Sequence, residues 1–118
     1  MCYNVPMQKM ITFPSGLKLV FVQNTAVRSV ALGVFVGAGV IRETPDINGV
    51  SHFIEHMLFK GTKTRSSFDI VNEIDSIGAQ INAYTSKSCT CFHTVSLDTN
   101  VEKCADVLSD MYFNPSFD

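Results

Sequence analysis

The sequence predicts an α+β fold, in which helices pack on a mainly antiparallel sheet. Short β-rich apolar segments alternate along the chain with segments whose apolar residues recur at helical spacing. A Pro-Ser-Gly turn joins the first two β-rich segments, which is typical of a hairpin. With 118 residues, 46% of them hydrophobic and 17% charged, the chain has the composition of one globular domain or part of one. Residues 1–118 are therefore expected to form a single unit.

Five segments are predicted to be strands. The segments "MQKMITF" and "LKLVFVQ" flank the turn residues Pro14 and Gly16. The next segment, "SVALGVFVGAG", is nearly continuously apolar, which favours an inner strand that ends at Gly37 and Gly39. Further along, "AQINAYTS" and "TCFHTVSL" have the pattern of two more strands joined by a short polar turn.

Three helices are predicted between and after these strands. The first runs from about residue 48 to residue 60, and Gly61 is placed to cap its end. The second begins where Ser66 and Asp69 have the spacing of a capping pair, and the third begins at a similar pair, Thr99 and Glu102. The apolar face expected of the second helix consists of Phe68, Val71, Ile74 and Ile77.

Charge and composition exclude several classes of protein. A formal net charge of −2 gives no electrostatic reason to expect nucleic acid or an anionic membrane as a partner. No apolar run approaches the roughly 20 residues that span a bilayer, and no secretory signal is visible. Four cysteines are too few and too irregularly spaced for a disulfide scaffold. A cytoplasmic location is therefore the default expectation.

The segment "SHFIEHM" in the first predicted helix carries the strongest chemical signal. At 100° per residue, His52, Glu55 and His56 fall at about 0°, 300° and 40°, on one polar arc. Two imidazoles one helical turn apart can bind one tetrahedral zinc ion. The neighbouring glutamate can then take a proton from a water molecule that the ion activates, and pass it to the leaving amine. This order of residues is the inverted form of the His-Glu-x-x-His motif.

The alternative interpretation is a polar patch on an otherwise apolar helix. A single histidine in such a helix is more often a hydrogen-bonded core residue than a metal ligand. Three polar residues at the spacing of a metal site are much rarer by chance, which favours the zinc interpretation. The remaining positions of the helix are apolar, so the helix is expected to be mostly buried: Phe53, Ile54, Met57 and Leu58.

Other candidate residues receive structural interpretations. His93 alternates with apolar residues along its strand and is expected to be a packed core histidine. Cys89 and Cys91 lack the partners of a zinc knuckle and are expected to be structural or incidental thiols. A solvated loop is expected around Arg65, and a solvated helix face around Glu73.

Taken together, three segments resemble the N-terminal region of the M16 family of zinc peptidases. "NGVSHFIEHMLFKGT" is preceded by "GAGVIRETPD" and followed by "GAQINAYTSK", and the similarity runs from about residue 8 to the end of the chain. The M16 family includes pitrilysin, insulin-degrading enzyme and the mitochondrial processing peptidases. The resemblance implies an N-terminal part of an M16-type metallopeptidase domain.

The resemblance also implies roles for particular residues. His52 and His56 would be zinc ligands, and Glu55 the general base of a zinc-dependent endopeptidase. Asn82 and Ala83 would line the active-site cleft, where the edge of the sheet pairs with an extended peptide substrate. Family members are larger and have paired homologous halves, so the expected partners are a missing C-terminal portion or homologous half, and a second copy of the chain.

One feature departs from the family pattern. The third zinc ligand of the family is a glutamate on a later helix, expected beyond residue 118. The acidic residues after the motif do not match it in position: Asp69, Glu73, Asp75, Asp98, Glu102, Asp106, Asp110 and Asp118. The chain is therefore expected to be a truncated portion of the domain, inactive alone. The alternative function is a non-catalytic M16-like subunit or scaffold, although the intact motif argues against it.

Overall fold

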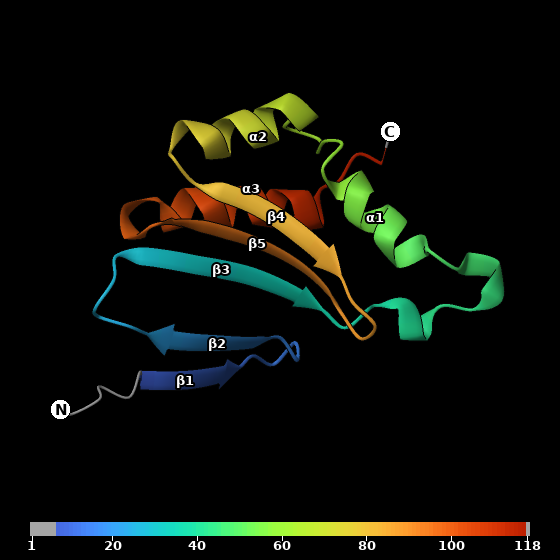
Figure 1. Cartoon of the computed structure of the whole chain (residues 1–118), viewed down its shortest axis with the longest axis horizontal. Coiled ribbons are helices and arrows are strands. Elements are labelled where there is room, and N and C mark those ends of the chain that lie inside the picture. The colour runs from blue at the N-terminus through green and yellow to red at the C-terminus, as the bar shows by residue number, and fades with distance from the viewer. Residues whose placement is uncertain (1–6, 118) are drawn as a thin grey trace.

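A computed structural model describes residues 7–117 and has the expected α+β fold. A three-stranded antiparallel sheet in the order β3-β5-β4 consists of Ser29–Val36, Thr90–Leu97 and Gln80–Thr85. The strands β1 (Met7–Thr12) and β2 (Lys18–Gln23) form a separate antiparallel hairpin. The helices are α1 (Val50–Leu58), α2 (Ser67–Ser76) and α3 (Val101–Phe113), and α1 lies beside the C-terminal end of β4 (Figure 1).

The central strand of the three-stranded sheet is β5, although the apolar run in β3 predicted an inner strand there. In the described part of the chain β3 pairs only with β5, and its side chains alternate between exposed and half-buried. On β5 the even-numbered side chains, from Thr90 to Ser96, are buried on the face that the helices cover. The apolar side chains of Val95 and Leu97 point to the opposite face and are exposed.

The core lies between this covered face and the helices. One cluster joins α2, α3 and the start of β4, and a second joins α1, α3 and β5 through Leu58, Leu108 and Phe92. The first cluster consists of Ile70, Ile74, Ala79, Cys104, Val107 and Met111. These residues fix the positions of the helices relative to β4 and β5.

The buried face of α2 differs from the predicted one. Ile70 and Ile74 are fully buried, whereas Phe68 is 73% exposed. A row of residues spaced only three apart winds around a helix, because each step turns it by about 300°. Phe68 and Ile77 are therefore about 180° apart, and only the Ile77 end of the predicted row faces the core.

The helix ends confirm one of the three predicted caps. Ser66 and Asp69 form a capping box at the start of α2. Gly61 does not cap α1, because the helix ends earlier, with Phe59 as its C-cap residue. The Thr99 and Glu102 box is absent from α3, because a short 3₁₀ turn, Asp98–Asn100, precedes the helix.

A polar network joins the loop after α1 to the end of α3, where a solvated loop was expected. The Arg65 guanidinium donates hydrogen bonds to Asp110 at 2.8 Å, to Asp106 at 2.6 Å and to Glu73 at 3.1 Å. The predictions of a solvated Arg65 and a solvated Glu73 were therefore wrong. Three further side chains donate to the buried carboxylate of Asp110: Thr62, Thr64 and Asn114.

This network should make folding stability sensitive to acid. Burial would raise the pKa of Asp110, but hydrogen bonds from Thr62 and Arg65 outweigh burial and hold this pKa well below its usual range. A carboxyl group whose pKa is lower in the folded state stabilises that state at pH values above its unfolded-state pKa of about 3.9. This contribution to folding stability disappears as the pH falls through the folded-state pKa. We expect the thermal midpoint to fall below about pH 4. An Asp110→Asn variant should lose part of this dependence of the thermal midpoint on pH. If the thermal midpoints of both proteins fell equally steeply with pH, Asp110 would not be the cause of the acid sensitivity.

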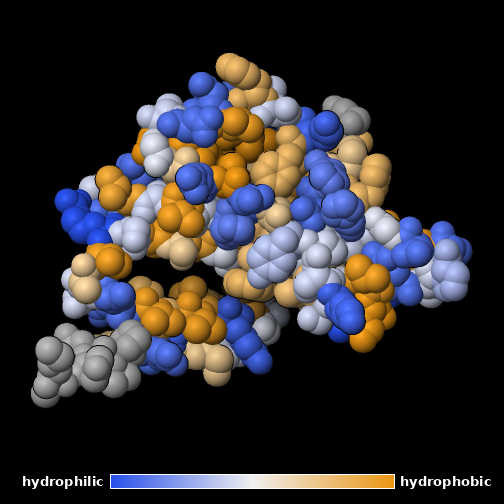
Figure 2. Space-filling model, in the orientation of Figure 1, coloured by the Kyte–Doolittle hydropathy of each residue, from blue (hydrophilic) through white to orange (hydrophobic). Residues whose placement is uncertain are grey.

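The hairpin leaves apolar surface uncovered. Its side chains are exposed on both faces, including Val20 at 63% and Phe21 at 52%. Figure 2 shows a hollow between the hairpin and the rest of the molecule, with hydrophobic side chains beside it. Such a surface favours self-association, which remains a prediction. Within residues 7–117, none of the helices has the length and hydropathy needed to cross a bilayer.

Candidate metal centre and peptide-binding edge

The helix that carries the histidines is capped by a side chain from the preceding loop. Its N-cap residue is Gly49, with φ of 90°, which offers no side chain to accept hydrogen bonds from the first turn. The Glu43 carboxylate accepts these bonds instead, from the backbone N–H groups of Gly49 at 2.7 Å and Ser51 at 2.9 Å. These bonds lower the pKa of Glu43. Sequence reasoning missed this residue, although a glycine at the N-cap indicates that the acceptor comes from elsewhere.

The loop that supplies Glu43 is itself attached to the turn between β4 and β5. The backbone N–H groups of Val40 and Ile41 donate to the carbonyl groups of Ser86 at 3.3 Å and Lys87 at 2.9 Å. A Cβ atom on Gly39 would lie 2.6 Å from the Ser86 carbonyl oxygen, so this approach requires glycine. Hydrogen bonds therefore hold the start of α1 against the end of β4.

The two histidines converge on one point in space. The Nε2 atoms of His52 and His56 are 3.1 Å apart, and both side chains are exposed. Two imidazoles bound to one tetrahedral zinc ion at the usual bond lengths have their nitrogens about 3.3 Å apart. The two Nε2 atoms are within hydrogen-bonding distance of each other, and their spacing matches that of two zinc-bound imidazoles. No group of three His, Cys, Asp or Glu side chains that could hold a metal occurs within residues 7–117.

Glu55 lies next to the histidines around α1, on the side of their polar arc that faces the sheet. It is buried, with 9% exposure, and the Thr85 hydroxyl at the end of β4 donates a hydrogen bond to its carboxylate. The prediction of a mostly buried helix was wrong, because the sheet contacts only this side of α1. Phe53 is 62% exposed and Ile54 43% exposed. Sequence reasoning also missed Thr85, for which only its place at the end of the "INAYT" strand is a signal.

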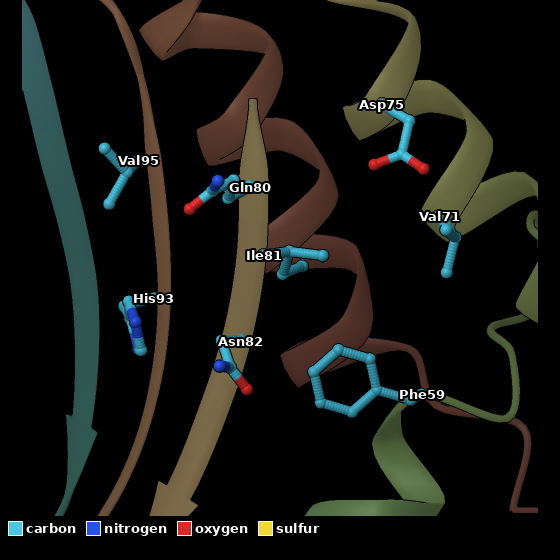
Figure 3. A pocket seen from close by; sticks show the side chains of 8 residues that line it. All are labelled: Phe59, Val71, Asp75, Gln80, Ile81, Asn82, His93 and Val95. Atoms are coloured by element: carbon cyan, nitrogen blue, oxygen red, sulfur yellow. The ribbon is translucent and has the colours of Figure 1, made fainter. Parts of the chain in front are cut away.

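The predicted peptide-binding residues lie on an edge strand. In the described sheet β4 pairs only with β5, so its other edge is open. The backbone N–H of Ala83 donates to the Asn82 side-chain oxygen at 2.8 Å instead of to a neighbouring strand. A pocket of about 470 Å³ lies along this strand. Figure 3 shows its lining residues on both sides of β4: Phe59, Val71, Asp75, Gln80, Ile81, Asn82, His93 and Val95.

His93 is not the packed core histidine that was predicted. It is half-buried on the uncovered face of the sheet, with its ring centroid 6.2 Å from that of Tyr84. Its Nδ1 atom has no hydrogen-bond partner among the described residues. The apolar side of β5 is the uncovered side, because the helices pack on the side that carries Phe92 and the hydroxyl residues. Cys89 and Cys91 are free thiols.

An α+β fold with an inverted His-x-x-Glu-His helix beside an open sheet edge is typical of the metallopeptidase class. The family profile described as insulinase, peptidase family M16, matches residues 18–118. The chain is a member of the M16 peptidase family.

Relatives in bacteria and plants agree with this membership. The chain is 49% identical over 112 residues to a zinc protease, YmxG, of Bacillus subtilis, covering 95% of this chain and 27% of that protein. A zinc protease of Streptomyces coelicolor is 43% identical over 100 residues, covering 85% and 22%. A probable mitochondrial-processing peptidase subunit beta of Arabidopsis thaliana is 37% identical over 115 residues, covering 98% and 22%. The chain thus spans about a quarter of the length of these relatives, whose names support a peptidase role and zinc in the family.

Proposed function

We propose that this chain supplies the zinc-binding helix and the peptide-binding edge of a peptidase that hydrolyses internal peptide bonds. The observation that carries the proposal is the convergence of the His52 and His56 Nε2 atoms, at 3.1 Å, on an exposed helix face. In an M16 chain this pair is the natural place for a divalent metal ion.

His52 and His56 would hold the zinc ion through their Nε2 atoms. A bound zinc ion supplies Lewis-acid chemistry, which makes a water molecule nucleophilic near neutral pH. A catalytic zinc ion usually has three protein ligands, and residues 7–117 place no third ligand beside the two histidines. The third ligand would be a glutamate beyond residue 118. The two histidines alone should therefore hold zinc weakly.

Glu55 would act as the general base. One of its carboxylate oxygens accepts the Thr85 hydrogen bond, which leaves the other oxygen to take the proton of the attacking water. The same carboxyl group would then pass that proton to the amine that leaves. A buried carboxylate suits this role, because water competes little for its hydrogen bonds.

The open edge of β4 would bind the substrate as an added strand. An extended peptide can pair with the backbone of β4 at Ala83, beside the Asn82 side chain, and its own side chains can enter the adjoining pocket. The Ala83 N–H is held by the Asn82 side chain, so a substrate carbonyl would take the place of that side-chain oxygen. Such pairing selects extended peptides over folded proteins.

Zinc titration of the 118-residue chain tests this proposal. We expect weak one-to-one binding in calorimetry, well below the affinity of a complete site, because loss of even an outer partner costs about 10–100-fold in affinity. His52→Ala should abolish the binding, and His93→Ala, at the only other histidine, should leave it unchanged. An absence of zinc binding at millimolar metal, or equal loss in both variants, would overturn the proposed site. Tight binding by the monomer would place the third ligand within these residues.

A further inference from the structure

The hydroxyl group of Thr85 lies where the proposed general base meets the proposed peptide-binding strand. We propose that Thr85 is a positioning residue, which holds the Glu55 carboxylate in the orientation that proton transfer requires. This inference rests on the proposed function and extends it to a residue outside the His-x-x-Glu-His motif.

The hydrogen bond from Thr85 has one direction. Thr85 Oγ1 donates to Oε2 of Glu55, and a hydroxyl group has a single proton to give. The other hydroxyl nearby is Thr90 Oγ1, 3.5 Å away, which donates its own proton to the Ala38 carbonyl at 2.9 Å. The Thr85 proton is therefore directed to Glu55. It is the one hydrogen bond to this carboxylate from the described residues.

Both partners of this bond are held by rigid elements. Thr85 is paired with Thr90 across the β4–β5 ladder. Glu55 is in the middle of α1, whose first turn is attached through Glu43 to the loop that binds the β4–β5 turn. The bond therefore closes a ring of contacts between α1 and the end of β4.

The position of Thr85 also couples the base to the substrate. Ala83 is two residues earlier on β4, which is about 6.6–6.8 Å along a strand. A peptide paired with β4 would thus be set at a fixed distance from the residue that orients the base. Without the hydroxyl, the carboxylate keeps its place in the chain but loses the bond that fixes its direction.

The effect should appear in turnover and not in binding. Loss of a hydrogen-bond partner that orients a metal ligand lowers activity by about 10–100-fold, and we expect a loss of the same order for the partner that orients the base. Thr85→Val, which removes the hydroxyl at nearly constant volume, should lower kcat by about this factor with KM and zinc content unchanged. Thr85→Ser, which keeps the hydroxyl, should stay close to the parent protein.

Thr94 provides the matched control. It is a buried threonine on the same covered face, paired with Ile81 of β4, and its hydroxyl has no partner among the described residues. Thr94→Val removes the same chemical group from the same layer and should leave kcat unchanged. Equal losses in Thr85→Val and Thr94→Val, or equal losses in Thr85→Ser and Thr85→Val, would show a packing effect and overturn the proposal.

The experiment separates this inference from the proposed function. Zinc-dependent hydrolysis of a fluorogenic peptide by the complete peptidase, and its loss in Glu55→Gln, test the function first. Crystal structures of the Thr85→Val and Thr85→Ser variants without metal then test the positioning role independently of activity. We expect the Glu55 carboxylate to leave its place in the Val variant and to keep it in the Ser variant. An unmoved carboxylate in both would overturn the role of Thr85, whatever the activity assay shows.

Discussion

Replacement of Glu55 by glutamine should abolish peptide hydrolysis by the complete peptidase while zinc remains bound. Glutamine has the same shape and can still accept a hydrogen bond from Thr85, so the local structure should persist. It cannot take a proton from water, and the loss of a general base lowers the rate by about 10²–10⁴-fold. His52 and His56 lie on the exposed side of α1 and keep their Nε2 atoms in place.

This prediction requires two measurements on the same samples. A fluorogenic-peptide assay gives kcat and KM, and metal analysis gives the zinc content. Glu102→Gln is a matched control, because Glu102 is an exposed glutamate in the first turn of α3. Near-parental turnover in Glu55→Gln would remove this residue from its role. Loss of zinc in the same variant would show instead that Glu55 supports the metal site.

Truncation of Asp110 to alanine should be the most destabilising single change in the polar network. The Arg65 and Asp110 side chains are only 14% and 9% exposed, and Asp110 accepts bonds from four side chains. Arg65 keeps Glu73 and Asp106 as partners when Asp110 is removed, but the buried Thr62 hydroxyl loses its acceptor, and a buried donor left unsatisfied costs about 1–3 kcal/mol. This is a sizeable part of the roughly 5–15 kcal/mol that stabilises a typical domain.

Asp106→Ala provides the comparison within the same network. Asp106 also pairs with Arg65, at 2.6 Å, but its side chain is 59% exposed. Exposed ion pairs contribute about 0–1 kcal/mol, so this variant should unfold at nearly the parental urea concentration. Urea unfolding followed by circular dichroism measures both free energies. Equal losses in the two variants would mean that burial of Asp110 does not set the strength of the network.

The network matters for the candidate site because it anchors the loop after α1. Thr62 and Arg65 follow the histidine helix by only a few residues, and both bind Asp110 on α3. At the other end of α1, Glu43 and Gly39 attach the helix to the β4–β5 turn. The position of the histidines therefore depends on contacts at both ends of α1.

Local patterns were sufficient to predict the element types and the candidate ligands. The α+β fold, the hairpin turn at Gly16 and the Ser66–Asp69 capping box all depend on residues close together in the chain. The convergence of His52 and His56 is likewise a property of one helical turn, since side chains four residues apart project together. Membership of the M16 family also follows from these segments.

Contacts between distant segments could not be predicted in this way. The sequence by itself determined which residues form α1 and that its two histidines share a direction, because helical geometry is local. Only the tertiary structure decided that Glu55 is buried against Thr85, that β5 is the central strand and that Arg65 is held by Asp110. These outcomes depend on which face of each element the sheet and helices cover, and periodicity shows that a face is apolar without showing what covers it.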